Sequence, residues 1–152
     1  MWNQPIEEKI AERGFIENYA SAINAKVIKL QKDKDDGGTD GIIEINGKER
    51  NIEARRKGYP NHRGWSSDKF QKGWESPCLS SGIILNERTI RNHQGKGFDY
   101  LVDIKGFPPR VATITPSMVD ELLNRPTRRM KSTNSGVWQD AKEVPLSWFQ
   151  EF

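Results

Sequence analysis

The hydrophobic positions near the N-terminus recur at the spacing of an α-helix. They lie four or five residues apart, at Ile6, Ile10, Phe15, Tyr19 and Ile23. This spacing predicts a helix, because residues four apart share one helical face. Pro5 suits the first turn of such a helix, whereas Gly14 leaves open one helix with a weak point or two short helices.

Shorter apolar runs downstream predict strands. The first is Lys26–Leu30, and the next two, residues 41–45 and 50–55, are joined through Asn46-Gly47. Asn-Gly between strand-like runs is the strongest short-range signal of a β-hairpin. Further strands are predicted at residues 81–85, and at 98–105 and 110–114 as a second hairpin.

The remaining chain alternates between one further helix and polar stretches. Thr115 followed by Pro116 predicts a helix start, with Thr115 as the N-cap. The basic stretches 88–97 and 125–136 are predicted as loops. Four large apolar residues near the C-terminus are expected to return to the core: Trp138, Leu146, Trp148 and Phe149. The pattern as a whole predicts an α/β fold.

Composition limits the size and setting of the protein. Its 152 residues suit one domain, residues 1–152, and 34% hydrophobic residues are enough to argue against global disorder. The net charge of +3 only weakly favours an anionic partner. The single cysteine, Cys78, excludes an internal disulfide and is expected to pack as a small apolar residue. Without a signal peptide pattern or a membrane-spanning apolar run, we expect a cytoplasmic protein that does not enter membranes.

The first hairpin carries the candidate chemistry. With Asn46 and Gly47 at the centre of the turn, Asp40 lies opposite Glu53 across the two strands. Side chains alternate between faces along a strand, so Ile43 and Ile52 form a core face and the two acids share the other face. Opposed Cβ atoms lie about 4.5–5.5 Å apart. Two carboxylates so close repel each other unless a cation lies between them, and Mg²⁺ prefers such oxygen ligands.

A purely structural interpretation of the same residues is the alternative. Acidic residues are common on solvent-exposed hairpin faces, and Asp40 can instead cap the turn that Gly37-Gly38 begins. A register shift of one residue would also exchange the two faces. The hairpin alone therefore suggests a metal site without deciding it.

The run Gly37–Glu44, a turn, and then Ile52-Glu53-Ala54-Arg55 resembles the core of the PD-(D/E)xK nuclease superfamily, which includes restriction endonucleases and archaeal Holliday junction resolvases. The resemblance implies a restriction endonuclease-like core, a mixed central sheet flanked by helices. It also implies that Asp40 and Glu53 bind Mg²⁺ (or Mn²⁺) in a DNA endonuclease. The helical acid of the family would be Glu17, with Glu8 as the alternative. A homodimer is implied in the same way.

The sequence departs from the family at the lysine, which is replaced by Arg55. Arginine stays protonated and cannot act as a general base, but it can position water or stabilise developing negative charge. Lys57, two residues further along the same face, can substitute from a displaced position. The departure leaves two hypotheses open: an active metal-dependent endonuclease, or a catalytically decayed nucleic-acid-binding or regulatory protein with the same fold.

Basic residues in the flanking segments are candidates for phosphate contacts. We select six of them: Arg56, Arg63, Lys69, Arg128, Arg129 and Lys131. Tyr59, Trp65 and Trp74 lie among them and could stack on bases, although ordinary aromatic packing explains them equally well. His62 and His93 lack zinc-type spacing, so a structural or surface role is expected for both. A protein-interaction module is a third interpretation, which solvent-facing aromatic residues near the C-terminus would support.

Overall fold

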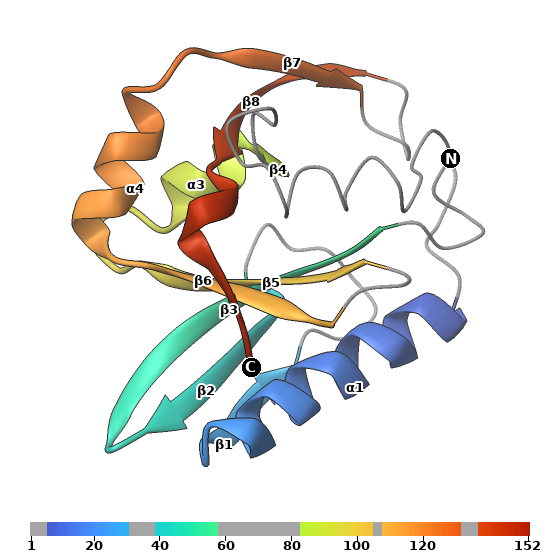
Figure 1. Cartoon of the computed structure of the whole chain (residues 1–152). Coiled ribbons are helices and arrows are strands. Elements are labelled where there is room, and N and C mark those ends of the chain that lie inside the picture. The colour runs from blue at the N-terminus through green and yellow to red at the C-terminus, as the bar shows by residue number, and fades with distance from the viewer. Residues whose placement is uncertain (1–5, 31–38, 58–82, 105–107, 132–136) are drawn as a thin grey trace.

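A computed structural model describes residues 6–30, 39–57, 83–104, 108–131 and 137–152 (Figure 1). Six strands form the larger sheet, in the spatial order β1-β2-β3-β5-β6-β9. Their bounds are β1 (Lys26–Leu30), β2 (Gly41–Ile45), β3 (Lys48–Lys57), β5 (Phe98–Ile104), β6 (Arg110–Ile114) and β9 (Phe149–Glu151). The sheet is mixed, because β3 and β5 run parallel while all its other neighbouring strands are antiparallel.

The β2–β3 hairpin has the predicted register. Ile45 pairs with Lys48, and Gly41 pairs with Ile52. Asn46 and Gly47 both have positive φ, at 52° and 77°, as the two-residue turn of a tight hairpin requires. Since this register continues to the start of β2, Asp40 comes opposite Glu53 as expected.

One helix covers the lower face of this sheet in Figure 1. It is α1 (Ile6–Ala22), a single helix that runs through Gly14 without a break. Its buried side chains, which include Ile16 and Tyr19, pack against Ile43 and Ile52 of the hairpin. The predicted core face of the hairpin is therefore confirmed. No helix in the described part of the chain is long and apolar enough to cross a membrane.

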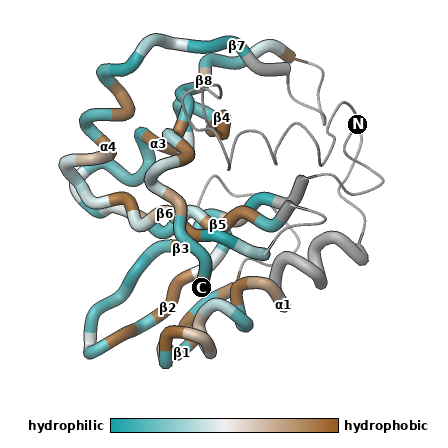
Figure 2. The backbone as a smooth tube through the Cα atoms, viewed as in Figure 1, coloured by the Kyte–Doolittle hydropathy of each residue, from teal (hydrophilic) through white to brown (hydrophobic). Residues whose placement is uncertain are grey.

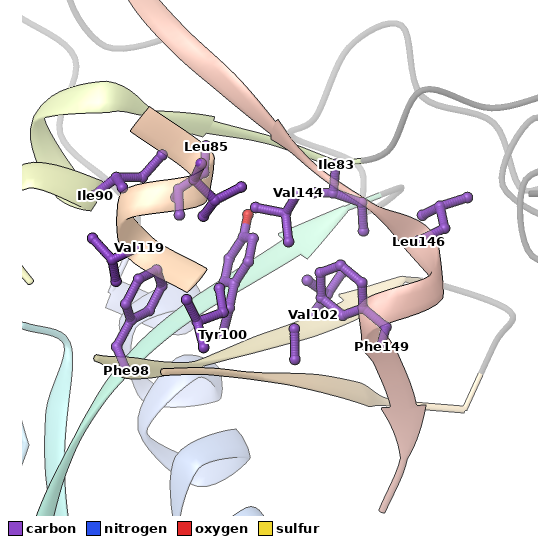
Figure 3. Packing of buried hydrophobic residues seen from close by; sticks show 13 residues of the cluster. Ile83, Leu85, Ile90, Phe98, Tyr100, Val102, Val119, Val144, Leu146 and Phe149 are labelled. Carbon is purple, nitrogen blue, oxygen red and sulfur yellow. The ribbon is translucent and has the colours of Figure 1, made fainter. Parts of the chain in front are cut away.

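The opposite face of the sheet is covered by a second layer of helices and strands (Figure 1). Its elements are β4 (Ile83–Asn86), α3 (Glu87–Asn92), α4 (Pro116–Leu123), β7 (Arg128–Lys131), β8 (Trp138–Val144) and the short 3₁₀ helix η2 (Leu146–Trp148). The strands of this layer form a small antiparallel sheet in the order β4-β8-β7. Between the layers lies a core in which Phe98, Tyr100 and Phe149 pack together (Figure 3).

Most predicted elements are confirmed, including the second hairpin of β5 and β6 and the helix α4, whose N-cap Thr115 accepts a hydrogen bond from the Met118 backbone N–H at 3.3 Å. Two predicted loops are wrong. The stretch 88–97 contains most of α3, which Asn86 caps, and the stretch 125–136 contains β7. Both elements are rich in arginine because their outer faces meet solvent, and β7 is largely hydrophilic (Figure 2).

The expectation that the four large apolar residues near the C-terminus return to the core holds only in part. Leu146 and Phe149 are buried in the core between the layers, and Trp148 packs against it. Trp138 does not return to the core, because 57% of it is exposed at the start of β8. Trp138 begins β8, the middle strand of the small sheet, where it pairs with Lys131 of the edge strand β7.

Candidate active site

The candidate site lies on the face of the sheet that is turned toward the second layer. Ile52 belongs to the core under α1, so its neighbour Glu53 points to the opposite face. Glu53 is buried, with 8% of the residue exposed. It pairs with Tyr100 of β5, which packs in the core between the layers. The part of the acidic face around Glu53 is therefore an interior surface, whereas Glu49 near the hairpin turn is exposed.

Side chains from the segment before β2 fix the position of Asp40. The Thr39 hydroxyl oxygen accepts a hydrogen bond from the Ile52 backbone N–H at 3.2 Å, and the Asp40 Oδ2 atom accepts one from the Ala54 N–H at 2.9 Å. These two bonds continue the β2–β3 pairing past Gly41, with side-chain oxygens in place of backbone carbonyls. Asp40 is thereby held beside Glu53 at the point where the hairpin strands part.

His93 contacts Glu53 directly. Its Nε2 atom lies 2.9 Å from the Glu53 Oε1 atom, and both side chains are buried. Burial and the nearby charge of Lys96 lower the pKa of His93 to about 4, against an opposing effect of Asp40. The imidazole is therefore neutral at pH 7 and donates its Nε2–H to the carboxylate. The Nδ1 atom has no hydrogen-bond partner among the described residues, in agreement with this tautomer.

The backbone around His93 is fixed by the turn that ends α3. The His93 N–H donates to the Ile90 carbonyl at 3.1 Å, and the Gly97 N–H donates to the His93 carbonyl at 3.0 Å. A Cβ atom at Gly97, where φ is +77°, would lie 2.6 Å from the Ile114 carbonyl oxygen, so this turn requires glycine. The imidazole also stacks on Phe98, with ring centroids 4.5 Å apart. His93 is thus a rigid partner for Glu53.

Arg55 reaches from β3 into the second layer. Its Nη1 atom donates a hydrogen bond to the Ile84 carbonyl of β4 at 2.5 Å. β4 and α3 follow each other in sequence, so one continuous segment contacts both Arg55, through Ile84, and Glu53, through His93. The Glu53-x-Arg55 motif is therefore positioned by this segment as well as by its own strand.

Tyr100 places a hydroxyl group among these charges, and Figure 3 shows its ring rising from β5 toward the second layer. Burial raises the pKa of Tyr100; the charge of Arg55 acts against this rise, whereas Glu53 and Asp40 add to it. All three predicted site residues of the hairpin are thus close enough to affect the pKa of the Tyr100 hydroxyl. The structure brings Asp40, Glu53 and Arg55 together, as the motif predicts.

The other candidate residues have different surroundings. Glu17 is exposed on α1, the helix that covers the opposite face of the sheet. Arg128 pairs with Glu143 at 3.0 Å, and Arg129 pairs with Asp140 at 2.5 Å. For some of the remaining candidates, in α1, β3 and β7, the backbone alone is described: Glu8, Arg56, Lys57 and Lys131. The others lie outside the described residues: Tyr59, His62, Arg63, Trp65, Lys69, Trp74 and Cys78.

His93 and Tyr100 are the site residues that sequence reasoning missed. His93 was expected to be structural or on the surface of a polar loop, but it ends a helix and binds Glu53. Its partner is 40 residues away in the sequence, and no local spacing signals such a contact. In the sequence, Tyr100 is recognisable only as an apolar position of a predicted strand.

The donor set at this site suits a hard cation. Asp40 and Glu53 offer carboxylate oxygens, and a carboxylate has about four lone-pair sites, so one hydrogen bond does not exhaust its capacity as a ligand. Within the described ranges, no group of three or more His, Cys, Asp or Glu residues is arranged to hold a metal ion. Two carboxylates suffice for Mg²⁺, which usually keeps several of its waters.

Comparison with protein-family models, with curated proteins and with solved structures returns no match.

Proposed function

We propose that this protein is a metal-dependent endonuclease that hydrolyses phosphodiester bonds in DNA, built on a restriction endonuclease-like core. The observation that carries the proposal is the pair formed by the half-buried Asp40 and the buried Glu53, opposed across the β2–β3 hairpin. Placing two like charges side by side with one of them buried is unfavourable, and a divalent cation between them would reverse the sign of that interaction.

The order of elements supports the same proposal. The resemblance implies a helix, a strand, an acidic hairpin, and then a further strand and helix. The chain forms α1, β1, the β2–β3 hairpin, β4 and α3 in this order. The acids also occupy the positions of the motif, with Asp40 just before β2 and Glu53 within β3.

The residues of the site have distinct roles in the proposed reaction. Asp40 and Glu53 would hold Mg²⁺ or Mn²⁺, which polarises the phosphate and lowers the pKa of bound water when present. Arg55 would stabilise negative charge that develops on the phosphate, since its guanidinium stays protonated. Lys57 is the candidate for orienting the attacking water. Glu17, on the other side of the sheet, is left out of this site.

His93 would act as a positioning residue for Glu53. A neutral imidazole that donates one hydrogen bond fixes the carboxylate without neutralising its charge. Partners of this kind orient metal-binding groups in many proteins, and their loss typically reduces metal affinity or activity 10- to 100-fold.

Nicking of supercoiled plasmid DNA in Mg²⁺ or Mn²⁺ tests the proposal. We expect cleavage by the native protein and a loss of at least about 100-fold in Glu53→Gln and Asp40→Asn. Glu49→Gln is the matched control, because Glu49 is an exposed residue on the same strand and on the same face as Glu53. Metal-independent cleavage, or equal rates in Glu49→Gln and Glu53→Gln, would overturn the proposal.

A decayed site that only binds nucleic acid is the second candidate function. The observation that favours it is Arg55, which replaces the lysine of the motif and donates to the Ile84 carbonyl. This function predicts DNA binding that falls steeply with salt and does not respond to Mg²⁺. If the folded protein binds DNA but does not cleave it in Mg²⁺ or Mn²⁺, that result would support the binding-only function.

A homodimer remains a prediction of the resemblance. Sedimentation of the protein with and without DNA measures it directly. A monomer in both conditions would contradict it without affecting the assignment of Asp40 and Glu53.

A further inference from the structure

A polar pocket lies on the outer side of the second layer, between α3 and the β7–β8 hairpin. It is a shallow hollow of about 410 Å³ that is largely open to solvent. Three arginines from two elements line it, Arg88 and Arg91 of α3 and Arg129 of β7, together with Trp138 of β8. Neither the Asp40–Glu53 pair nor its partner His93 contributes to this lining.

Trp138 is unusual in its exposure. It is 57% exposed, and its neighbour Val137 is 56% exposed, so two large apolar side chains in succession face solvent. Tryptophan offers the largest apolar surface of any side chain and normally buries most of it. An indole left open beside guanidinium groups offers a flat surface that a ligand can cover.

Two of the three arginines form ion pairs with neighbouring carboxylates. Arg91 contacts the Glu87 carboxylate through Nε at 3.1 Å and Nη2 at 2.6 Å, and Arg129 contacts Asp140 at 2.5 Å. Arg88 is exposed and forms no ion pair with the residues that the structure describes. Exposed ion pairs contribute only about 0–1 kcal/mol. A phosphate group can therefore replace the Asp140 carboxylate on Arg129 at little cost.

The charge of the pocket indicates how much of a ligand it can neutralise. Three arginines and the two carboxylates of Glu87 and Asp140 give a net charge of +1. This charge can neutralise one or two phosphates, but not a long stretch of nucleic-acid backbone. Affinity must therefore come largely from the indole, because stacking of a base on an aromatic side chain contributes about 1–3 kcal/mol.

We propose that this pocket binds one unpaired nucleotide of a nucleic-acid strand, with its base stacked on Trp138 and its phosphate held by Arg88 and Arg129. A base inside a duplex cannot offer its face to the indole, so the proposal selects strands with an unpaired segment. It rests on the proposed function for the choice of nucleic acid as ligand, but the binding itself requires neither metal nor cleavage.

The position of the pocket relates it to the candidate active site. The helix α3 presents Arg88 and Arg91 on its exposed side and ends at His93, the partner of Glu53. A strand held at the pocket would thus be bound to the same segment that positions Glu53. Tryptophan and arginine are also common at protein interfaces; we choose a nucleotide as the ligand because it supplies both a flat base for the indole and an anion for the guanidinium groups.

The test is the affinity of a fluorescently labelled oligothymidylate, measured by anisotropy in EDTA at low salt. We expect Trp138→Ala to weaken binding about tenfold or more and Trp138→Phe to retain most of it, since phenylalanine still stacks. Arg88→Gln and Arg129→Gln should weaken binding several-fold and reduce its dependence on salt. Lys48→Gln is the control: it removes one exposed positive charge from the β2–β3 hairpin, at a residue that does not line the pocket.

The ligand comparison uses two further probes, a duplex of the same length and free AMP. We expect the duplex to bind more weakly than the single strand, and AMP to bind far more weakly than either. Preference for the duplex, an AMP affinity equal to that of the strand, or equal losses in Lys48→Gln and Arg129→Gln would overturn the proposal. Unchanged binding in Trp138→Ala would do the same.

Failure of this proposal and failure of the proposed nuclease are distinguishable. Single-strand binding that depends on Trp138, without cleavage in any metal, leaves the pocket assigned and rejects the nuclease. Metal-dependent cleavage that Trp138→Ala leaves intact, with unchanged strand affinity, rejects the pocket and leaves the nuclease. Thermal unfolding of each variant confirms that the substitutions, all at exposed positions, leave the fold in place.

Discussion

The two faces of the larger sheet each bury a carboxylate, and the two carboxylates are held in different ways. Asp99, on the α1 side, accepts a hydrogen bond from the Tyr19 hydroxyl at 2.8 Å and is paired with the Arg50 guanidinium. Glu53, on the other side, accepts one from the neutral His93 imidazole and lies opposite Asp40. The structure pairs Asp99 with an opposite charge, whereas the hydrogen bond from His93 orients Glu53. The first arrangement is typical of a structural pair and the second of a functional site.

The difference is visible in the surrounding groups as well. Burial raises the pKa of Asp99, and the Arg50 charge and the Tyr19 hydrogen bond oppose that rise. Asp99 is only 1% exposed, so its ionised form depends on these partners. On the Glu53 side, the partner His93 is neutral, and the nearby Arg55 guanidinium donates to the Ile84 carbonyl. We therefore expect substitutions on the α1 side to affect stability, and those on the Glu53 side to affect function.

The largest expected effect follows removal of the Arg50 charge. Arg50→Met leaves the Asp99 carboxylate buried without its cation, and breaking a buried pair from one side costs about 3 kcal/mol or more. Urea unfolding measures the loss. Lys48→Met, which removes an exposed charge from the same strand, should change the free energy of unfolding by less than about 0.5 kcal/mol. Similar values for the two variants would contradict the structural role of the Asp99 pair.

The second prediction concerns pH on the Glu53 side. The pKa of His93 is lowered from 6.5 to about 4 in the folded protein, so between these values the unfolded chain binds a proton that the native protein does not. This contribution to stability is complete above pH 6.5 and is lost as the pH falls toward 4, by about 1.4 kcal/mol per pH unit. His93→Gln should show a correspondingly flatter profile in urea unfolding at stepped pH. Parallel profiles for the two proteins would show that His93 titrates normally.

A third prediction compares the two carboxylates directly. Asp99→Asn should lower the free energy of unfolding by about 2 kcal/mol, because Arg50 loses its charged partner. Glu53→Gln should change it by less than about 1 kcal/mol, since the Gln carbonyl still accepts the His93 hydrogen bond and repulsion from Asp40 disappears. Parallel urea titrations measure both. A larger loss in Glu53→Gln would reverse the assignment of the two faces.

The smallest expected effect is a gain in stability. The Tyr100 hydroxyl is buried; Arg55 is close enough to lower its pKa, but no described residue meets the hydroxyl in good hydrogen-bond geometry, and such a group costs about 1 kcal/mol or more. Tyr100→Phe should therefore raise the free energy of unfolding by about 1 kcal/mol. Thermal and urea unfolding test this. A decrease would show that the hydroxyl has a partner, with Arg55 as the first candidate.

Local signals explain what could be predicted from the sequence. The Asn46-Gly47 turn determines the hairpin register, and the register alone places Asp40 opposite Glu53. Thr115 and Pro116 likewise mark the start of α4 within two residues. These features depend on neighbours in the chain, so the sequence contains all the information that they need.

Features that depend on distant partners could not be predicted. In α3 only Ile90 is buried, so the helix has no apolar stripe and its arginines resemble those of a loop. In β7 the charges of Arg128 and Arg129 are matched by Glu143 and Asp140 of β8, across the strand pair. His93 binds Glu53 across 40 residues. Each of these features depends on tertiary contacts that no periodicity in the sequence indicates.

The parallel pairing of β3 with β5 has a consequence for the order of events in folding. The β2–β3 hairpin is local, and hairpins form within microseconds, so Asp40 and Glu53 meet early. The pairing of Ile52 with Asp99 and the contact between Glu53 and His93 require closure of a long loop, whose entropy cost slows folding. The two acids are therefore adjacent before the segment that positions them arrives, and the site becomes rigid only in the last stages of folding.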